Sequence, residues 1–87
     1  MPIRLEDLLS SFRRHLRAAN KAPPTIELNS QIVRYFSRWL TDRGREPVLD
    51  ELTRHTIATW LDELAETCEP STVGTRLRGM RRFCRGW

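Results

Sequence analysis

The chain has 87 residues, enough for one small domain, and no apolar run approaches the ~20 residues that span a membrane. Its two cysteines, Cys68 and Cys84, and the lack of a secretory signal argue against a disulfide scaffold, so we expect a soluble intracellular protein with reduced thiols. The net charge is +4, and residues 71–87 carry five arginines and no acidic residue. Such a basic segment is typical of nucleic-acid binding.

Apolar residues recur every three or four positions, which predicts helices and no strands. The first helix is expected at about residues 4–19 and ends before Pro23 and Pro24, since proline interrupts a helix. A second helix is predicted at about residues 25–43, with Thr25 as its N-cap and Gly44 as its C-cap glycine. Asn29 falls on the apolar side of this helix and would need a hydrogen-bond partner if buried.

A third helix is predicted at about residues 53–67, after a short turn at residues 49–52 that directs two leucines inward. Thr53 is its predicted N-cap. Its apolar positions should form a buried stripe with Trp60 beside it, namely Ile57, Leu61, Leu64 and Cys68. Its outer face carries Asp62, Glu63 and Glu66, which makes that face a poor candidate for DNA contact.

The fourth helix is predicted at about residues 71–86, with Ser71 as its cap. One side is apolar and is expected to face the core, through Val73, Leu77, Met80, Cys84 and Trp87. The opposite side is polar and basic, through Ser71, Thr75, Arg78, Arg82 and Arg85, with Arg81 at its edge and Arg76 on another flank. Gly79 would permit close packing against a neighbouring helix or the backbone, which would offset its low helix propensity. Four helices joined by short loops predict a compact all-α bundle.

No catalytic or metal-binding pattern is apparent in the sequence, and we expect neither cofactor nor metal. The histidines and cysteines lack the spacing of a zinc site, and the glycines at positions 74 and 79 fall within a helix rather than a phosphate-binding loop. The acidic residues of the third helix are better interpreted as a solvated face than as a metal cluster. Tyr35, the only tyrosine, is expected to pack its ring at a boundary rather than to act as a nucleophile.

The basic helix favours DNA binding over two other interpretations. A helix fits the major groove of B-DNA, roughly 12 Å wide, where arginines contact phosphates or guanine. Ser71, Thr72 and Thr75 lie near the helix N-terminus and suit phosphate contacts. The alternative is a helical protein-interaction module that docks on an acidic partner. A helix-turn-helix regulator is less favoured, because the basic helix is the last of the four and no tight helix pair precedes it.

Four blocks of the sequence, in order, resemble the N-terminal core-binding domain of tyrosine recombinases, the phage integrases. The first two are Leu5-x-x-Leu8-Leu9-x-x-Phe12-x-x-x-Leu16 and Pro24-Thr25-Ile26-(x)6-Val33-x-x-Phe36-x-x-Trp39-Leu40. The last two are Leu52-Thr53-x-x-x-Ile57-x-x-Trp60-Leu61-x-x-Leu64 and Ser71-x-Val73-x-x-x-Leu77-x-x-Met80-Arg81-x-Phe83-x-x-x-Trp87. The resemblance covers nearly the whole chain.

The resemblance implies a SAM-like helical bundle that forms half of a clamp around double-stranded DNA, with the second and fourth helices facing the major groove. Carried onto this sequence, the DNA contacts are Thr25, Gln31, Arg34, Arg38, Ser71, Thr72, Thr75, Arg78, Arg81, Arg82 and Arg85. It further implies one domain over residues 1–87 without the catalytic domain, which holds the family's Arg/His/Arg/Tyr site. The expected setting is bacterial or phage-derived and cytoplasmic, with a monomeric isolated domain that meets other recombinase protomers on DNA.

Overall fold

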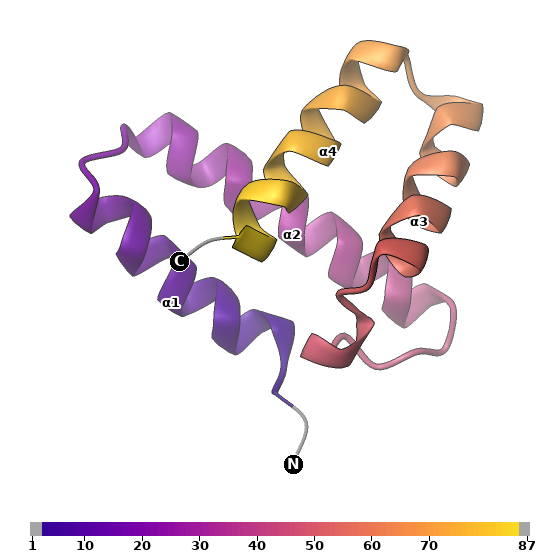
Figure 1. Ribbon diagram of the computed structural model, residues 1–87, viewed down its shortest axis with the longest axis horizontal. Helices are drawn as coiled ribbons and strands as arrows, with labels where there is room; N and C mark the ends of the chain where they lie inside the picture. The colour runs from indigo at the N-terminus through magenta and orange to yellow at the C-terminus, as the bar shows by residue number, and fades with distance from the viewer. Residues whose placement is uncertain (1–2, 86–87) are drawn as a thin grey trace.

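The computed structural model describes residues 3–85 and contains four α-helices in this range (Figure 1). They are α1 (Leu5–Ala18), α2 (Pro23–Asp42), α3 (Arg54–Thr67) and α4 (Pro70–Arg85), with a 3-10 turn, η1, at Leu49–Glu51. Residues 3–85 form no strand, and Arg4 pairs with Val48 in an isolated bridge. The predicted all-α, four-helix SAM-like architecture is confirmed, and each described helix boundary lies within two residues of its prediction.

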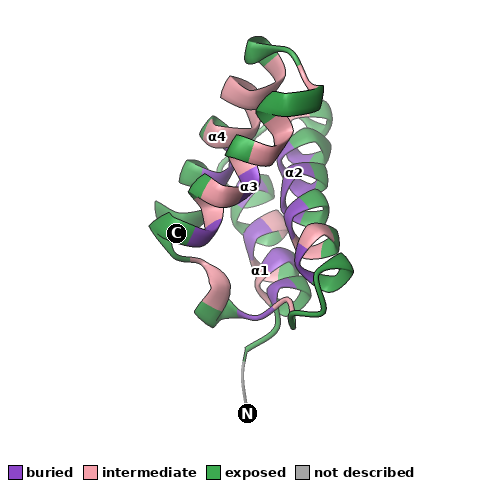
Figure 2. Ribbon diagram, turned by 90° about the vertical axis from the view of Figure 1, so that its right-hand side faces the viewer, coloured by how far each residue is buried: buried purple, intermediate pink, exposed green. Residues whose placement is uncertain are grey.

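The helices form two antiparallel pairs (Figure 1). α1 and α2 make one pair, α3 and α4 make the other, and α4 crosses over α2. The molecule is flat, with principal extents of 36 × 35 × 18 Å. Burial is greatest where the two pairs meet (Figure 2), so each helix keeps one broad side exposed.

The helix ends follow local chemistry. α2 begins at Pro23, with Ala22 as its N-cap, so the predicted cap at Thr25 is wrong; prolines are tolerated in a first turn, where their missing N–H has no helical partner. α4 likewise begins at Pro70, which places Ser71 inside the first turn instead of at the cap. The Thr53 cap of α3 is confirmed, since its hydroxyl accepts from the Thr56 amide at 3.1 Å.

Two residues with left-handed backbone follow α1 and α2. Gly44 has φ of 75° directly after α2, as its predicted capping role requires. Asn20 has φ of 60° after α1, and asparagine tolerates this conformation better than most residues. Asn20 lets the chain turn soon after α1, so the connection from α1 to α2 stays short, and Gly44 lets it turn after α2.

The core joins all four helices through aromatic rings. Phe12 of α1 meets Phe83 of α4 edge-on at 5.1 Å, and Phe36 of α2 meets Trp60 of α3 at 5.2 Å. Trp60 is buried, whereas the predicted α3 stripe is only half-buried, at Ile57, Leu61, Leu64 and Cys68. Ile57, Leu61 and Leu64 still pack against the core, so the predicted side of α3 is the inward one, but its most buried residue is Trp60, whose ring meets Phe36. The turn prediction fails at Leu49, which is 40% exposed.

The buried side of α4 is rotated from the predicted one. Gly79, Met80 and Phe83 are buried, Val73 and Leu77 are half-buried, and Cys84 is exposed; Trp87 lies outside the described residues. The cause is the close contact with α2, since a Cβ at position 79 would lie 2.5 Å from Ile32 Cδ1. A side chain at this position would force Ile32 to shift, so glycine favours the close approach of the two helices. The prediction that Gly79 serves helix packing fits this geometry.

Asn29 is a buried polar residue on α2 that the fold satisfies. It is 6% exposed, and its Nδ2 donates to the Thr25 carbonyl at 2.7 Å. Ser30 is also buried, donates to the Ile26 carbonyl and accepts from Arg13 Nη1 at 2.8 Å. Over residues 3–85, no buried side-chain nitrogen or oxygen lacks a partner. A buried polar group costs little when it is hydrogen-bonded, so Asn29 is compatible with the apolar side of α2.

Candidate nucleic-acid interface

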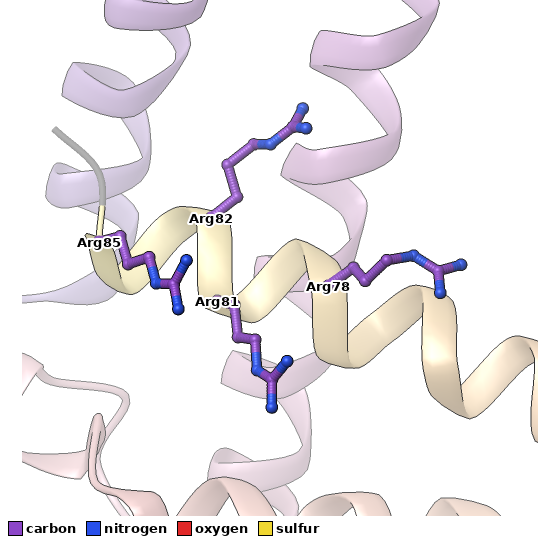
Figure 3. Close-up of a pocket in the computed structure, with 4 residues that line it drawn as sticks. All are labelled: Arg78, Arg81, Arg82 and Arg85. Atoms are coloured by element: carbon purple, nitrogen blue, oxygen red, sulfur yellow. The ribbon is translucent and has the colours of Figure 1, made fainter.

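Four arginines of α4 surround one shallow depression on the surface (Figure 3). Arg78, Arg81, Arg82 and Arg85 are all exposed, and they alone line it. Arg82 points to the side of α1 and α2, and Arg81 points to the side of α3 (Figure 3). The helix therefore spreads four guanidinium groups over its solvent-facing side, with donors directed along and across its axis.

No carboxylate among residues 3–85 forms an ion pair with the arginines of this site. The arginines that form ion pairs in the described part of the chain lie elsewhere, in the pairs Arg4–Glu6, Arg13–Glu27, Arg34–Glu27, Arg43–Glu63 and Arg45–Glu51. None of the α4 arginines has such a partner among residues 3–85. Clustered like charges without counter-charges create a positive surface potential that attracts anions.

The hydroxyl residues predicted as DNA contacts lie in the first turns of α4, and they differ in how far they are exposed. Ser71 is exposed, whereas Thr72 and Thr75 are half-buried. The Thr75 hydroxyl donates to the Ser71 carbonyl at 2.9 Å and accepts from Arg78 Nη2 at 3.4 Å. The hydroxyl proton of Thr75 is already donated within the helix. Thr75 is therefore better placed to orient Arg78 than to donate a hydrogen bond to a ligand.

The predicted contacts on α2 do not join the depression on α4. Gln31, Arg34 and Arg38 are exposed and Thr25 is half-buried, but none of them lines it. Arg34 pairs with Glu27, which also binds Arg13 of α1. Ile32 marks the side of α2 that faces α4, and Arg34 lies about 200° further round the helix. Arg34 is therefore turned away from α4 and toward α1.

The sequence matches the family model for the N-terminal SAM-like domain of phage integrase over residues 8–86. The chain belongs to this family. Neither a curated protein nor a solved structure matched it in the corresponding searches.

This phage-integrase N-terminal domain has one arginine contact that the sequence did not reveal. Arg76 of α4 lies over the ring of Tyr35 of α2, with its Cζ 4.2 Å from the ring centroid. The helical pattern set Arg76 apart from the other arginines without giving it a partner. Its spacing from Gly79 and Phe83 was the available signal, because residues three and four apart share one side of a helix. Once Gly79 marks the contact with α2, Arg76 must face α2 as well.

Other kinds of site receive no support from the described part of the domain. Within residues 3–85, no group of three or more His, Cys, Asp or Glu side chains could hold a metal ion. None of the helices in that range is long and apolar enough to cross a membrane. Cys68 and Cys84 are free thiols.

Proposed function

We propose that this domain is the DNA-binding, non-catalytic part of a tyrosine-type site-specific recombinase, and that it grips duplex DNA with α4 in the major groove during integration or recombination. The observation that carries the proposal is the group of exposed arginines on α4 that have no carboxylate partner among residues 3–85, in a chain of the phage-integrase family. Cleavage and strand exchange would belong to a separate catalytic domain, with other protomers assembled on the same DNA.

The chemistry of the site suits a nucleic acid. A guanidinium group is planar and can give two parallel hydrogen bonds to a phosphate or to the O6 and N7 atoms of guanine. An α-helix fits the roughly 12 Å width of the major groove. Arg78, Arg81, Arg82 and Arg85 face solvent from successive turns of α4, so they can follow such a groove along the helix axis.

Binding of the 87-residue chain to a fluorescent duplex, followed by anisotropy over a salt series, tests the proposal. Four phosphate contacts imply a slope of log affinity against log salt of about −3.6. Arg78→Ala/Arg82→Ala should weaken binding at least tenfold and reduce the slope by about 1.8. The matched control is Arg4→Ala/Arg45→Ala, which removes the same charge from two exposed arginines that lie outside α4 and are each paired with a carboxylate.

Three outcomes would contradict the proposal. A salt-independent affinity would mean that phosphate contacts do not dominate binding. Equal losses in both double variants would mean that net charge matters and that α4 has no special position. Binding to an acidic polypeptide at least as tight as to DNA would instead favour a protein-docking module.

A further inference from the structure

Arg76 differs from the other arginines of α4 in its surroundings. It is half-buried between α4 and α2, whereas Arg78, Arg81, Arg82 and Arg85 are exposed on the outer side. Its guanidinium lies over the Tyr35 ring at 4.2 Å. Tyr35 is 46% exposed as a residue, so the pair lies at the surface in the corner between the two helices.

The contact with Tyr35 is an attraction between the guanidinium charge and the ring, and it needs no hydrogen-bond acceptor. It therefore leaves most of the five N–H donors of Arg76 for other partners. No carboxylate binds Arg76 among residues 3–85. A side chain that is already held in place loses less conformational entropy on binding than a free one does. Arg76 is thus a preorganised, unneutralised donor.

Polar residues of both helices flank this pair. Gln31 and Arg38 lie about 40° and 60° from Tyr35 around α2, and both are exposed. Thr72 lies one turn before Arg76 on α4 and is half-buried. Gln31 and Arg38 do not line the depression on the outer side of α4. Tyr35 lies beside them on α2 and connects their side of this helix to α4 through Arg76.

We propose that Arg76 binds a backbone phosphate of the DNA duplex in the corner between α2 and α4, and that Tyr35 is the positioning residue that holds it there. This inference rests on the function proposed above. A helix in the major groove has a sugar–phosphate strand on each side, so contacts from two sides of α4 are compatible with one duplex. Arg76 would serve the strand beside α2, and Gln31 and Arg38 would lie next to that strand.

The test uses the same duplex and the whole chain, with variants at both positions. Arg76→Ala should weaken binding on the order of tenfold and reduce the salt slope by about 0.9, the value of one phosphate. Arg76→Lys should keep the slope and recover part of the affinity, because the charge remains while the planar fork is lost. Tyr35→Phe should bind nearly as the parent chain does, since the ring still supports the guanidinium.

A double-mutant cycle checks the positioning role of Tyr35. Tyr35→Ala should weaken binding, and Tyr35→Ala/Arg76→Ala should be no weaker than Arg76→Ala alone, because both changes remove one contact. Additive losses would overturn this role and make Tyr35 an independent contact. Melting curves of each variant establish that it is folded.

The failure of this inference is separate from the failure of the proposed function. Unchanged affinity and slope in Arg76→Ala, with a clear loss in Arg78→Ala/Arg82→Ala, would overturn the role of Arg76 and leave the α4 interface intact. If the parent chain itself does not bind the duplex, the proposed function fails, and with it this inference.

Discussion

At the scale of single residues, the two glycines inside α4 have opposite roles. A Cβ at position 79 would lie 2.5 Å from Ile32 Cδ1 and 3.2 Å from its Cγ2, whereas one at position 74 meets only Arg78 Nη1, at 3.6 Å. Gly74→Ala should therefore stabilise the fold by about 0.5–1 kcal/mol through helix propensity. Gly79→Ala should destabilise it by about 1–2 kcal/mol, since overpacking exceeds that gain. Urea unfolding measures both, and a stabilised Gly79→Ala would contradict the tight helix crossing.

The thiol of Cys84 should react slowly in the folded protein. Its residue is exposed overall, but it lines a groove with Leu77 of α4 and Ile57 of α3, and burial raises the pKa of the thiol. At about pH 8 a raised pKa leaves less thiolate, which is the reactive form. Alkylation by iodoacetamide, located by mass spectrometry, should be slower at Cys84 in the folded chain than in urea, and the difference should shrink as the pH rises. If Cys84 were alkylated equally fast in the folded chain and in urea, at about pH 8 and at higher pH, the raised pKa of its thiol would be contradicted.

At the scale of elements, the start of α3 depends on one side chain. The Thr53 hydroxyl accepts from the Thr56 amide and donates to the Thr56 hydroxyl at 2.9 Å. Thr53→Ala should cost about 1 kcal/mol of unfolding free energy, the usual value for a lost N-cap. Thr59→Ala is the matched control, because its hydroxyl only bonds back to the His55 carbonyl within the helix and alanine favours helix interiors. Equal losses in the two variants would remove the capping role.

The sequence predicted where the helices lie better than how they are rotated. Apolar spacing located all four helices, and Thr53 and Gly44 marked two of their ends correctly. The inward side of α4 was misjudged because an average over apolar residues gives no weight to Gly79, whose missing side chain sets the contact with Ile32. On α3 the predicted side does face the core, but the sequence did not show that Trp60 would be more buried than the stripe beside it, since this depends on the position of Phe36.

For the candidate site as well, features of a single helix were predicted and contacts with other helices were not. The arginines on α4 could be grouped from their spacing alone, because they need only one helix, and Arg78, Arg81, Arg82 and Arg85 do line one depression. The partners that individual arginines meet on other helices were not predicted. Arg34 is held toward α1 by Glu27, and Arg76 lies on Tyr35, and both depend on how α2 meets its neighbours.

At the scale of the whole molecule, DNA binding and folding should be coupled through the charge of α4. A duplex at about 100 times its dissociation constant would stabilise the folded chain by about 2.7 kcal/mol, which raises the melting temperature of a domain this small by roughly 10–20 °C. A slope of about −3.6 lowers the affinity roughly 150-fold when salt rises fourfold, so the stabilisation should almost vanish. Differential scanning calorimetry with and without duplex, at both salt concentrations, measures this. Polyglutamate at equal charge is the control. If it stabilised the chain as much as DNA does, the arginines of α4 would recognise negative charge alone. The spacing of phosphates along a groove would then play no part.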